Sequence, residues 1–155
     1  MDYKVSDKAK YIYKILCETE KLYGYMLKRA NITDSEYVLF FSVLEMGEGC
    51  SQKDIAENTH ISTKTLNSTV KKLEQSGLIK LKPGKYPNMH IYLTPKGEKY
   101  AKEKVLPVTN SIDNFLEDIP EKDFSHFSSV VNRYLNMFSG LVDVGIKNNL
   151  FKKEQ

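Results

Sequence analysis

The sequence predicts a mainly helical chain with a small β-hairpin, on three observations. Apolar residues recur at helical spacing over most of its 155 residues. Between residues 51 and 77, a short helix, a turn and a second helix follow one another, with residues suited to helix ends at their boundaries. Two short runs rich in β-branched and aromatic residues come next, separated by a loop that contains Pro and Gly. This order is typical of a winged helix-turn-helix between longer helices.

Residues 5–29 are expected to form one long helix, frayed near Gly24 and ending before Asn31, because their apolar residues keep a helical period. A second helix follows in "TDSEYVLFFSVLEMGEG", residues 33–49. It opens with Thr33 and Glu36 at the spacing of a capping box and closes at a pair of glycines. Its very apolar middle predicts that this second helix is buried.

The helix-turn-helix occupies residues 51–77. Ser51 is a suitable N-cap for a short helix, and Ser62 is a suitable N-cap for the next one. The buried stripe of the second helix is predicted at residues spaced i, i+4 and i+7, which are Leu66, Val70 and Leu73. Gly77 ends that helix, in a position where a left-handed residue is favoured.

The wing and the last helices are predicted by equally local signals. "LIKLK" and "MHIYLT" are expected to pair as strands around "PGKYPN". Thr94 and Pro95 begin a helix, since proline is tolerated in the first turn. Pro107 is expected to kink that helix before it ends near Leu116. A last helix starts near Pro120 and carries a wide apolar stripe, which includes Phe124, Phe127, Val130, Val131, Tyr134, Leu135, Phe138 and Leu141.

The helices at both ends of the chain have wide apolar stripes and no domain of their own to bury them. Such stripes favour intertwining with a second copy, because left exposed they promote aggregation. The sequence therefore predicts a two-fold homodimer. Its parts are an N-terminal dimerisation helix (1–32), a winged helix-turn-helix (33–95) and C-terminal dimerisation helices (96–155).

Composition excludes several classes of protein. No run of about 18 apolar residues and no signal-peptide core is present, so a soluble, cytoplasmic protein with no membrane role is expected. The two cysteines and three histidines are scattered, which argues against a disulfide framework or a metal site. No nucleophile–base pair, glycine-rich phosphate loop or paired carboxylates are apparent, so we expect neither an enzyme nor a cofactor.

The positive charge is concentrated in one part of the chain. The net charge is only +3, but residues 50–99 hold nine lysines against four acidic residues. The outer face of the helix after Ser62 is polar or basic until Glu74 and consists of Thr63, Lys64, Asn67, Ser68, Lys71 and Lys72. By itself such a face more often marks a solvated helix. Placed second in a helix-turn-helix and before a wing, it favours binding to DNA.

The stretches "DIAENTHISTKTLNSTVKKLEQSGLIK" and "LTPKGEKY" resemble the multiple-antibiotic-resistance regulator (MarR) family of transcription factors. The resemblance extends to the lengths and order of the flanking helices. It implies a homodimer that binds an inverted-repeat operator in double-stranded DNA and most often represses transcription. Two departures concern the site. The wing lacks the arginine that the family usually carries near its tip, and Ser68 stands where arginine is frequent.

The proposed DNA site combines base readers with phosphate contacts. Thr63, Lys64, Asn67 and Ser68 lie toward the start of the helix that would enter the major groove, so we assign them to base edges. Phosphate contacts are expected from Lys53, Lys71 and Lys72 and from the helix N-termini capped by Ser51 and Ser62. In the wing, Lys85, helped by Lys82, would replace the missing arginine.

The resemblance also implies a pocket for a small aromatic or phenolic effector. Tyr11, Tyr13, Tyr23 and Tyr37, with Tyr25, are plentiful in the region that would line it, although core and interface tyrosines are the more common reading of such a group. Some relatives sense oxidants through a cysteine on the first helix. Cys17 lies on that helix but lacks a basic neighbour that would favour its thiolate, and a redox role for Cys17 or Cys50 stays open.

Three functions remain compatible with the sequence. The first is a homodimeric repressor of the MarR type, relieved by an effector. The second is a winged-helix module that binds other proteins and has lost specific DNA binding. The third is a PadR-like regulator, which shares the wing but relies more on its C-terminal helix for dimerisation.

Overall fold

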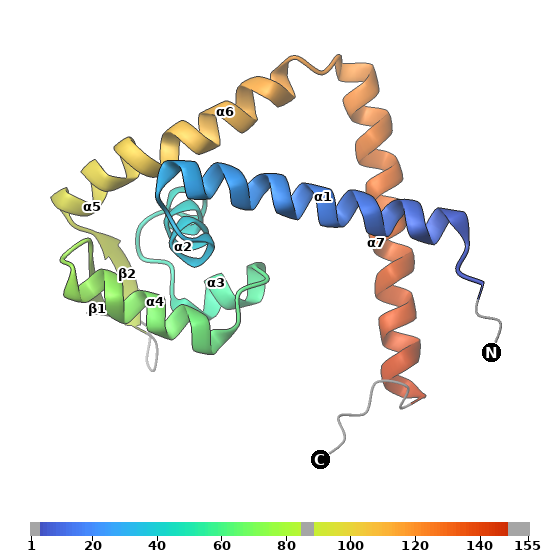
Figure 1. Cartoon of the computed structure of the whole chain (residues 1–155). Coiled ribbons are helices and arrows are strands. Elements are labelled where there is room, and N and C mark those ends of the chain that lie inside the picture. The colour runs from blue at the N-terminus through green and yellow to red at the C-terminus, as the bar shows by residue number, and fades with distance from the viewer. Residues whose placement is uncertain (1–3, 85–88, 149–155) are drawn as a thin grey trace. The chain divides into compact units, whose positions relative to one another are not determined.

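The computed structural model describes residues 4–84 and 89–148. The chain divides into two compact units, Met1–Ser111 and Ile112–Gln155. The first unit holds four helices, a two-stranded antiparallel sheet and the helical segment that follows it (Figure 1). The second holds the end of that segment and one long helix. The predicted mainly helical fold with a small β wing is confirmed.

Helix α1 spans Asp7–Ala30. The Ser6 hydroxyl accepts a hydrogen bond from the backbone N–H of Ala9 at 3.2 Å, and Asn31 ends the helix in the left-handed conformation with φ of 55°. The fraying expected near Gly24 is wrong, because the helix continues through this residue. Glycine inside a helix costs only about 1 kcal/mol relative to alanine, too little to interrupt 24 residues that form hydrogen bonds on both sides of it.

Helix α2 spans Asp34–Met46 and forms the centre of the first unit. Both hydrogen bonds of the predicted capping box are present, between Thr33 and Glu36. Leu39 and Phe40 are fully buried, and α2 contacts α1, α4 and the segment after the wing. The prediction of a buried second helix is confirmed.

The helix-turn-helix consists of α3, Gln52–Asn58, and α4, Thr63–Gln75. Ser51 caps α3 in a capping box with Asp54, and the Ser62 hydroxyl accepts the backbone N–H of Thr65 at 3.1 Å. Gly77 follows α4 with φ of 72°, the left-handed conformation that glycine adopts without strain. These helix ends agree with the sequence signals.

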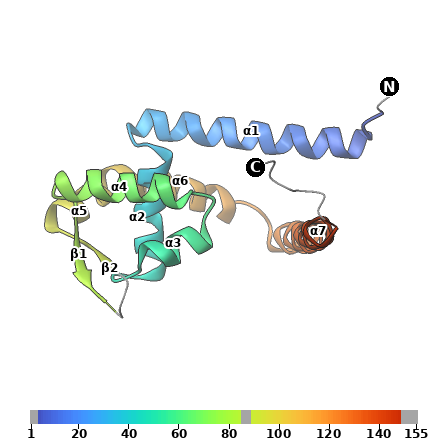
Figure 2. The ribbon, with the colours of Figure 1, turned by 90° about the horizontal axis from the view of Figure 1, so that it is seen from below.

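The wing pairs β1, Ile79–Pro83, with β2, Met89–Leu93, in an antiparallel register that places Leu81 opposite Ile91. Figure 2 shows the two strands side by side. Residues 49–51 lie along the other edge of β2, where the Gly49 N–H donates to the Ile91 carbonyl and the Ile91 N–H donates to the Cys50 carbonyl, both at 2.9 Å. The start of the helix-turn-helix is thereby tied to the wing.

After the wing, α5 spans Pro95–Tyr100, a π-helical turn η1 spans Ala101–Val105, and α6 spans Leu106–Glu117. The interruption lies before Pro107, and the helix continues through the proline. Pro107 has no N–H to donate, and its ring crowds the carbonyl of residue 103. In the wider turn, the Leu106 N–H donates to the Ala101 carbonyl, five residues back, which accommodates the proline without ending the helix.

The second unit consists of the end of α6 and of α7, Glu121–Lys147. Helix α7 begins after Pro120 as predicted, and among its 27 residues only Gly145 is buried. None of the described helices is both long and apolar enough to cross a membrane.

Candidate nucleic-acid interface

Helix α4 is held by one apolar face and presents the other to solvent. Leu66 is fully buried, while Val70 and Leu73 are each 2% exposed. Thr69 completes the inner face, where its hydroxyl lies 2.9 Å from the Ser35 hydroxyl of α2. The outward face consists of exposed residues, which include Thr63, Lys64, Asn67, Ser68, Lys71 and Lys72. All six predicted residues of the recognition helix are therefore accessible.

The side chains on the outward face differ in whether they form hydrogen bonds or ion pairs within the chain. Among the described residues, none of the hydrogen bonds or ion pairs involves the side chains of Lys64, Asn67 or Lys71. The Ser68 hydroxyl instead donates to the Thr65 carbonyl of its own helix at 2.8 Å. A serine bonded to its helix backbone has to turn away before it can donate to a base, so Ser68 is the weakest of the four proposed base readers.

Lys72 is committed to an ion pair within the chain. Its ammonium donates to Glu36 Oε1 at 2.7 Å, and the Glu36 side chain is only 10% exposed. Burial by itself raises the pKa of the Glu36 carboxyl, but the hydrogen bonds from Lys72 and Thr33 hold that pKa below its usual value. Glu36 in turn raises the pKa of Lys72. The pair joins α4 to the first turn of α2.

The predicted phosphate contacts before α4 are placed differently from one another. Ser51 is 2% exposed, and its hydroxyl is occupied by the backbone N–H of Asp54 at 3.2 Å. The exposed Lys53 ammonium lies 3.7 Å from the Glu57 carboxylate. Ser62 is exposed and caps α4. The N-terminus of α4 is thus the more accessible of the two helix ends, and the buried Ser51 serves local structure.

The wing is described only in part. The Lys82 ammonium lies over the Tyr92 ring, 4.7 Å from its centroid, which is within the range of a cation–π contact. Lys85, which we predicted to reach the DNA, lies outside the described residues. The assignment of Lys85 therefore stays a prediction.

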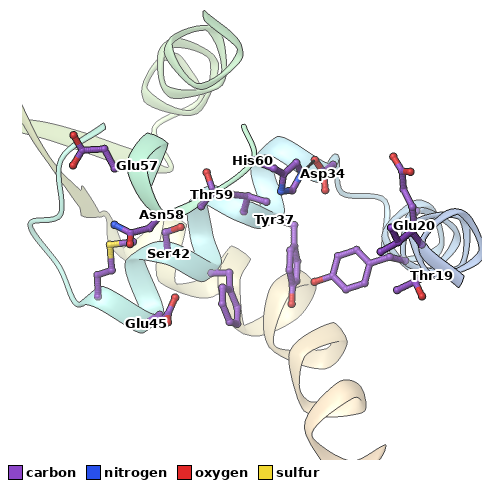
Figure 3. A pocket seen from close by; sticks show the side chains of 16 residues that line it. Thr19, Glu20, Asp34, Tyr37, Ser42, Glu45, Glu57, Asn58, Thr59 and His60 are labelled. Carbon is purple, nitrogen blue, oxygen red and sulfur yellow. Dashed lines mark hydrogen bonds and ion pairs between the residues drawn. The ribbon is translucent and has the colours of Figure 1, made fainter. Parts of the chain in front are cut away.

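An open cavity of about 1120 Å³ lies between α1, α2 and the end of α3 (Figure 3). Of the predicted effector tyrosines, Tyr23 and Tyr37 line it, with ring centroids 5.6 Å apart and planes at 81°. Burial and the adjacent Tyr37 hydroxyl raise the pKa of Tyr23 above its ordinary value. Tyr11 and Tyr13 are 65% and 71% exposed and do not line the cavity. Tyr25 contacts Arg29 instead.

Sequence reasoning missed two parts of this region. Glu36 was recognised as a capping residue but not as the partner of Lys72, because the two residues are 36 positions apart and carry no local signal of contact. The remaining walls of the cavity were also missed, including Phe41, Ser42 and Asn58. They come from α2 and α3, whose relative positions are set by the whole fold.

The two cysteines lie in different environments. Cys17 is exposed, whereas Cys50 is buried beside β2. Burial and the carboxylate of Asp54 raise the pKa of the Cys50 thiol, so this thiol is held in the less reactive, protonated form. Within the described ranges, no group of three or more His, Cys, Asp or Glu side chains is placed to hold a metal ion.

Residues 47–80 match a family model described as winged helix-turn-helix DNA-binding. This stretch contains α3, α4 and the start of β1. A comparison of the sequence with curated proteins finds no match.

Solved structures similar to the chain include transcriptional regulators of the MarR family. A MarR-family transcriptional regulator from Rhodococcus sp. RHA1 matches with a TM-score of 0.64 and 17% identity, over 82% of this chain and 94% of that one. The PcaV regulator from Streptomyces coelicolor, solved with its natural ligand, matches with a TM-score of 0.66 and 14% identity, over 86% and 98%.

A structure of NadR in complex with 4-hydroxyphenylacetate matches with a TM-score of 0.63 and 19% identity, over 86% of this chain and 96% of that one. These likenesses cover most of the chain. The chain therefore contains a winged helix-turn-helix domain within the fold of the MarR-family transcriptional regulators.

Proposed function

We propose that this protein is a sequence-specific double-stranded DNA-binding regulator that acts as a homodimeric repressor. The observation that carries the proposal is the outward face of α4, where Lys64, Asn67 and Lys71 are exposed and have no polar partner among the described residues. Long polar side chains of this kind, on the second helix of a helix-turn-helix, suit the major groove.

Residues on the outward face of α4 are assigned to two kinds of contact with DNA, to base edges and to phosphates. Lys64 and Asn67 lie in the first turns of α4 and are assigned to base edges, since lysine donates to guanine acceptors and asparagine pairs with adenine. Lys71 lies further along α4 and is assigned to phosphate. We assign Lys72 a positioning role instead, because its ion pair with Glu36 fixes α4 against α2.

The exposed apolar surface of the terminal helices supports dimerisation. On α7, Phe127, Phe138 and Leu141 are 63%, 54% and 65% exposed, more apolar surface than a solvated helix presents. On α1, Ile15, Leu16 and Leu22 are exposed as well. A two-fold dimer would read an inverted repeat whose half-sites lie roughly 10 bp apart.

A small-molecule effector forms the last part of the proposal. Two of the similar regulators were solved with ligands, one of them 4-hydroxyphenylacetate. The cavity beside Tyr23 and Tyr37 is of a size that fits such molecules. Its wall includes Glu57–His60, immediately before the Ser62 cap of α4, so a bound molecule would contact the segment that positions the recognition helix.

The test is a fluorescence-anisotropy titration of the full chain with the DNA upstream of its own gene, at two salt concentrations. Saturable binding that weakens steeply with salt is expected. Lys64→Ala and Asn67→Ala should each weaken specific binding by about 1–3 kcal/mol if they read bases. Lys14→Ala, which removes an exposed lysine from α1, is the control for net charge. No binding at low salt would contradict the proposal and favour a protein-interaction module.

A further inference from the structure

The cavity between α1, α2 and α3 is lined by several acidic side chains. Four of the residues that line it carry carboxylates, namely Glu20, Asp34, Glu45 and Glu57, and none is a lysine or arginine. Figure 3 shows Glu20 at the α1 end of the cavity, Glu45 and Glu57 at the opposite end, and Tyr37 between them. Two of these acids have nitrogen atoms close by, since an oxygen of Asp34 lies 3.2 Å from His60 Nε2 and an oxygen of Glu57 lies 3.7 Å from the Lys53 ammonium. Glu20 and Glu45 have no ion-pair partner within the described ranges.

The middle of the cavity is aromatic. The rings of Tyr37 and Phe41 stack with centroids 5.9 Å apart, and the Tyr23 ring stands nearly perpendicular to Tyr37. The electron-rich faces of such rings attract cations as well as other aromatic rings. Both the walls and the rim of this cavity therefore favour a positively charged aromatic molecule over a carboxylate.

A polar group inside the cavity is available to a ligand. Ser42 lines the cavity and is only 1% exposed, yet the hydrogen bonds among the described residues include none from its hydroxyl. Fully enclosed side-chain oxygens in the described part of the chain all have partners, so the Ser42 hydroxyl is one that still reaches the open space of the cavity. Because it reaches this space, the hydroxyl can exchange a contact with water for a hydrogen bond to a ligand. A ligand with a polar atom at this depth of the cavity would form that hydrogen bond.

We propose that this cavity binds a small arylalkylamine in its cationic form, in preference to an aromatic carboxylate. The carboxylates at both ends of the cavity give it a negative potential that attracts the amine, and the aromatic ring of the ligand packs against Tyr37 and Phe41. Binding of the amine can be measured without DNA. Only its consequence for regulation, through Glu57–His60 and the start of α4, rests on the proposed function.

Three compounds with the same phenol ring and different charge test this preference. Isothermal titration calorimetry of the full chain compares tyramine, which is cationic, with the neutral 2-(4-hydroxyphenyl)ethanol and the anionic 4-hydroxyphenylacetate. Tyramine should bind about fivefold more tightly than the alcohol and at least tenfold more tightly than the acid, as expected for a cation in a cavity that holds two partly solvated carboxylates without ion-pair partners. The affinity for tyramine alone should fall as salt is added.

Charge-neutralising variants locate the site. Glu20→Gln combined with Glu45→Gln should weaken tyramine binding about fivefold to tenfold and leave the alcohol within about twofold, because only the charged ligand interacts with the missing charges. Glu98→Gln, on α5 and outside the cavity lining, is the matched control and should change neither affinity. Circular dichroism of each variant reports whether the fold is retained.

Three results would overturn the inference. They are binding of 4-hydroxyphenylacetate as tight as that of tyramine, no binding of any of the three compounds, or equal tyramine affinity in the wild type and the double variant. Each would leave the DNA titration unaffected. Conversely, tyramine binding together with absent DNA binding would refute the proposed function alone.

Discussion

Helices α4 and α7 have similar amphipathic sequences and opposite relations to the rest of the chain. The apolar stripe of α4 is buried within the first unit, with Leu66, Val70 and Leu73 at most 2% exposed. The apolar stripe of α7 is left open, with Phe127 at 63% and Leu135 at 53% exposed. A hydrophobic period predicts that a face will be covered, but it does not say whether the same chain or a second copy covers it.

The difference also separates two roles. Because the apolar inner face of α4 is buried within the first unit, its outer face is free to carry polar groups that contact a partner. In the proposed dimer, the partner-binding surface of α7 is its exposed apolar side. The exposed polar face of α4 suits a charged partner such as DNA, and the exposed apolar face of α7 suits a second copy of the same helix.

The largest effect is expected from a charge placed on the open stripe of α7. Phe127→Glu should weaken self-association at least about 100-fold, since a central aromatic residue contributes about 2 kcal/mol or more to an interface and is present twice in a two-fold dimer. Sedimentation equilibrium measures the change. Ser129→Glu, nearly opposite on the same helix, is the control. A wild-type protein that is monomeric at micromolar concentration would contradict the proposal that a second copy covers the apolar stripe of α7.

A smaller side chain in the buried apolar stripe of α4 should lower the stability of the fold instead. Leu66→Ala is expected to lower the free energy of unfolding by about 2–5 kcal/mol, because it leaves a cavity in a well-packed core. Urea denaturation at fixed protein concentration measures the loss, since dimer formation contributes to apparent stability. Thr63→Ala on the exposed side should stay within about 0.5 kcal/mol. Equal losses for both variants would contradict the assignment of the two faces.

The two neighbouring lysines of α4 sharpen the comparison further. Lys71→Ala should reduce the slope of log affinity for DNA against log salt concentration by about 1, as expected for one lost phosphate contact. Lys72→Ala should reduce that slope much less, because its ammonium is already paired with Glu36. Affinity measured at four or more salt concentrations gives both slopes. Identical slopes for the two variants would show that the ion pair opens on DNA.

The smallest effect is expected on the stability of the fold as the pH is lowered. Hydrogen bonds hold the pKa of Glu36 and of Asp54 below the usual carboxyl range in the folded state. A depressed folded pKa contributes stability above the unfolded pKa, about 4 for these groups, and that contribution is lost as the pH falls through the folded value. Thermal unfolding between pH 6 and pH 3 should therefore show a decline that Glu36→Gln makes shallower. An unchanged slope in this variant would refute a role for the Glu36 charge.

Local signals predicted the fold well, because the features that define it are short. The caps at Thr33, Ser51, Ser62 and Thr94 each join residues three apart and are visible in the sequence. The wing and the buried stripe of α4 follow from periodicity. The π-helical turn was not predictable, because it depends on how the helix accommodates Pro107 as well as on the proline itself.

The site was less predictable than the fold. Exposure of the outward face of α4 followed from its period, but the pairing of Lys72 with Glu36 depends on how α4 packs on α2. The prediction of effector tyrosines rests on their abundance in the first two helices, and two of the four line the cavity. Tyr11 and Tyr13 show why abundance is insufficient, since neighbours on a helix point in different directions.

The π-helical turn at Ala101–Val105 imposes a constraint on length. It adds residues to a turn without ending the helix, so the residues after it are displaced around the axis relative to an uninterrupted helix. If the wide turn persisted, deleting one residue there would rotate the rest of the helix by about 100°. Val108 would leave its buried position, and the Thr109 hydroxyl would leave the Tyr37 hydroxyl, from which it now lies 3.2 Å. The exposed Lys102 and Glu103 can therefore change identity without shifting this register, whereas a change in the number of residues between Tyr100 and Pro107 has to be matched by a change in the turn.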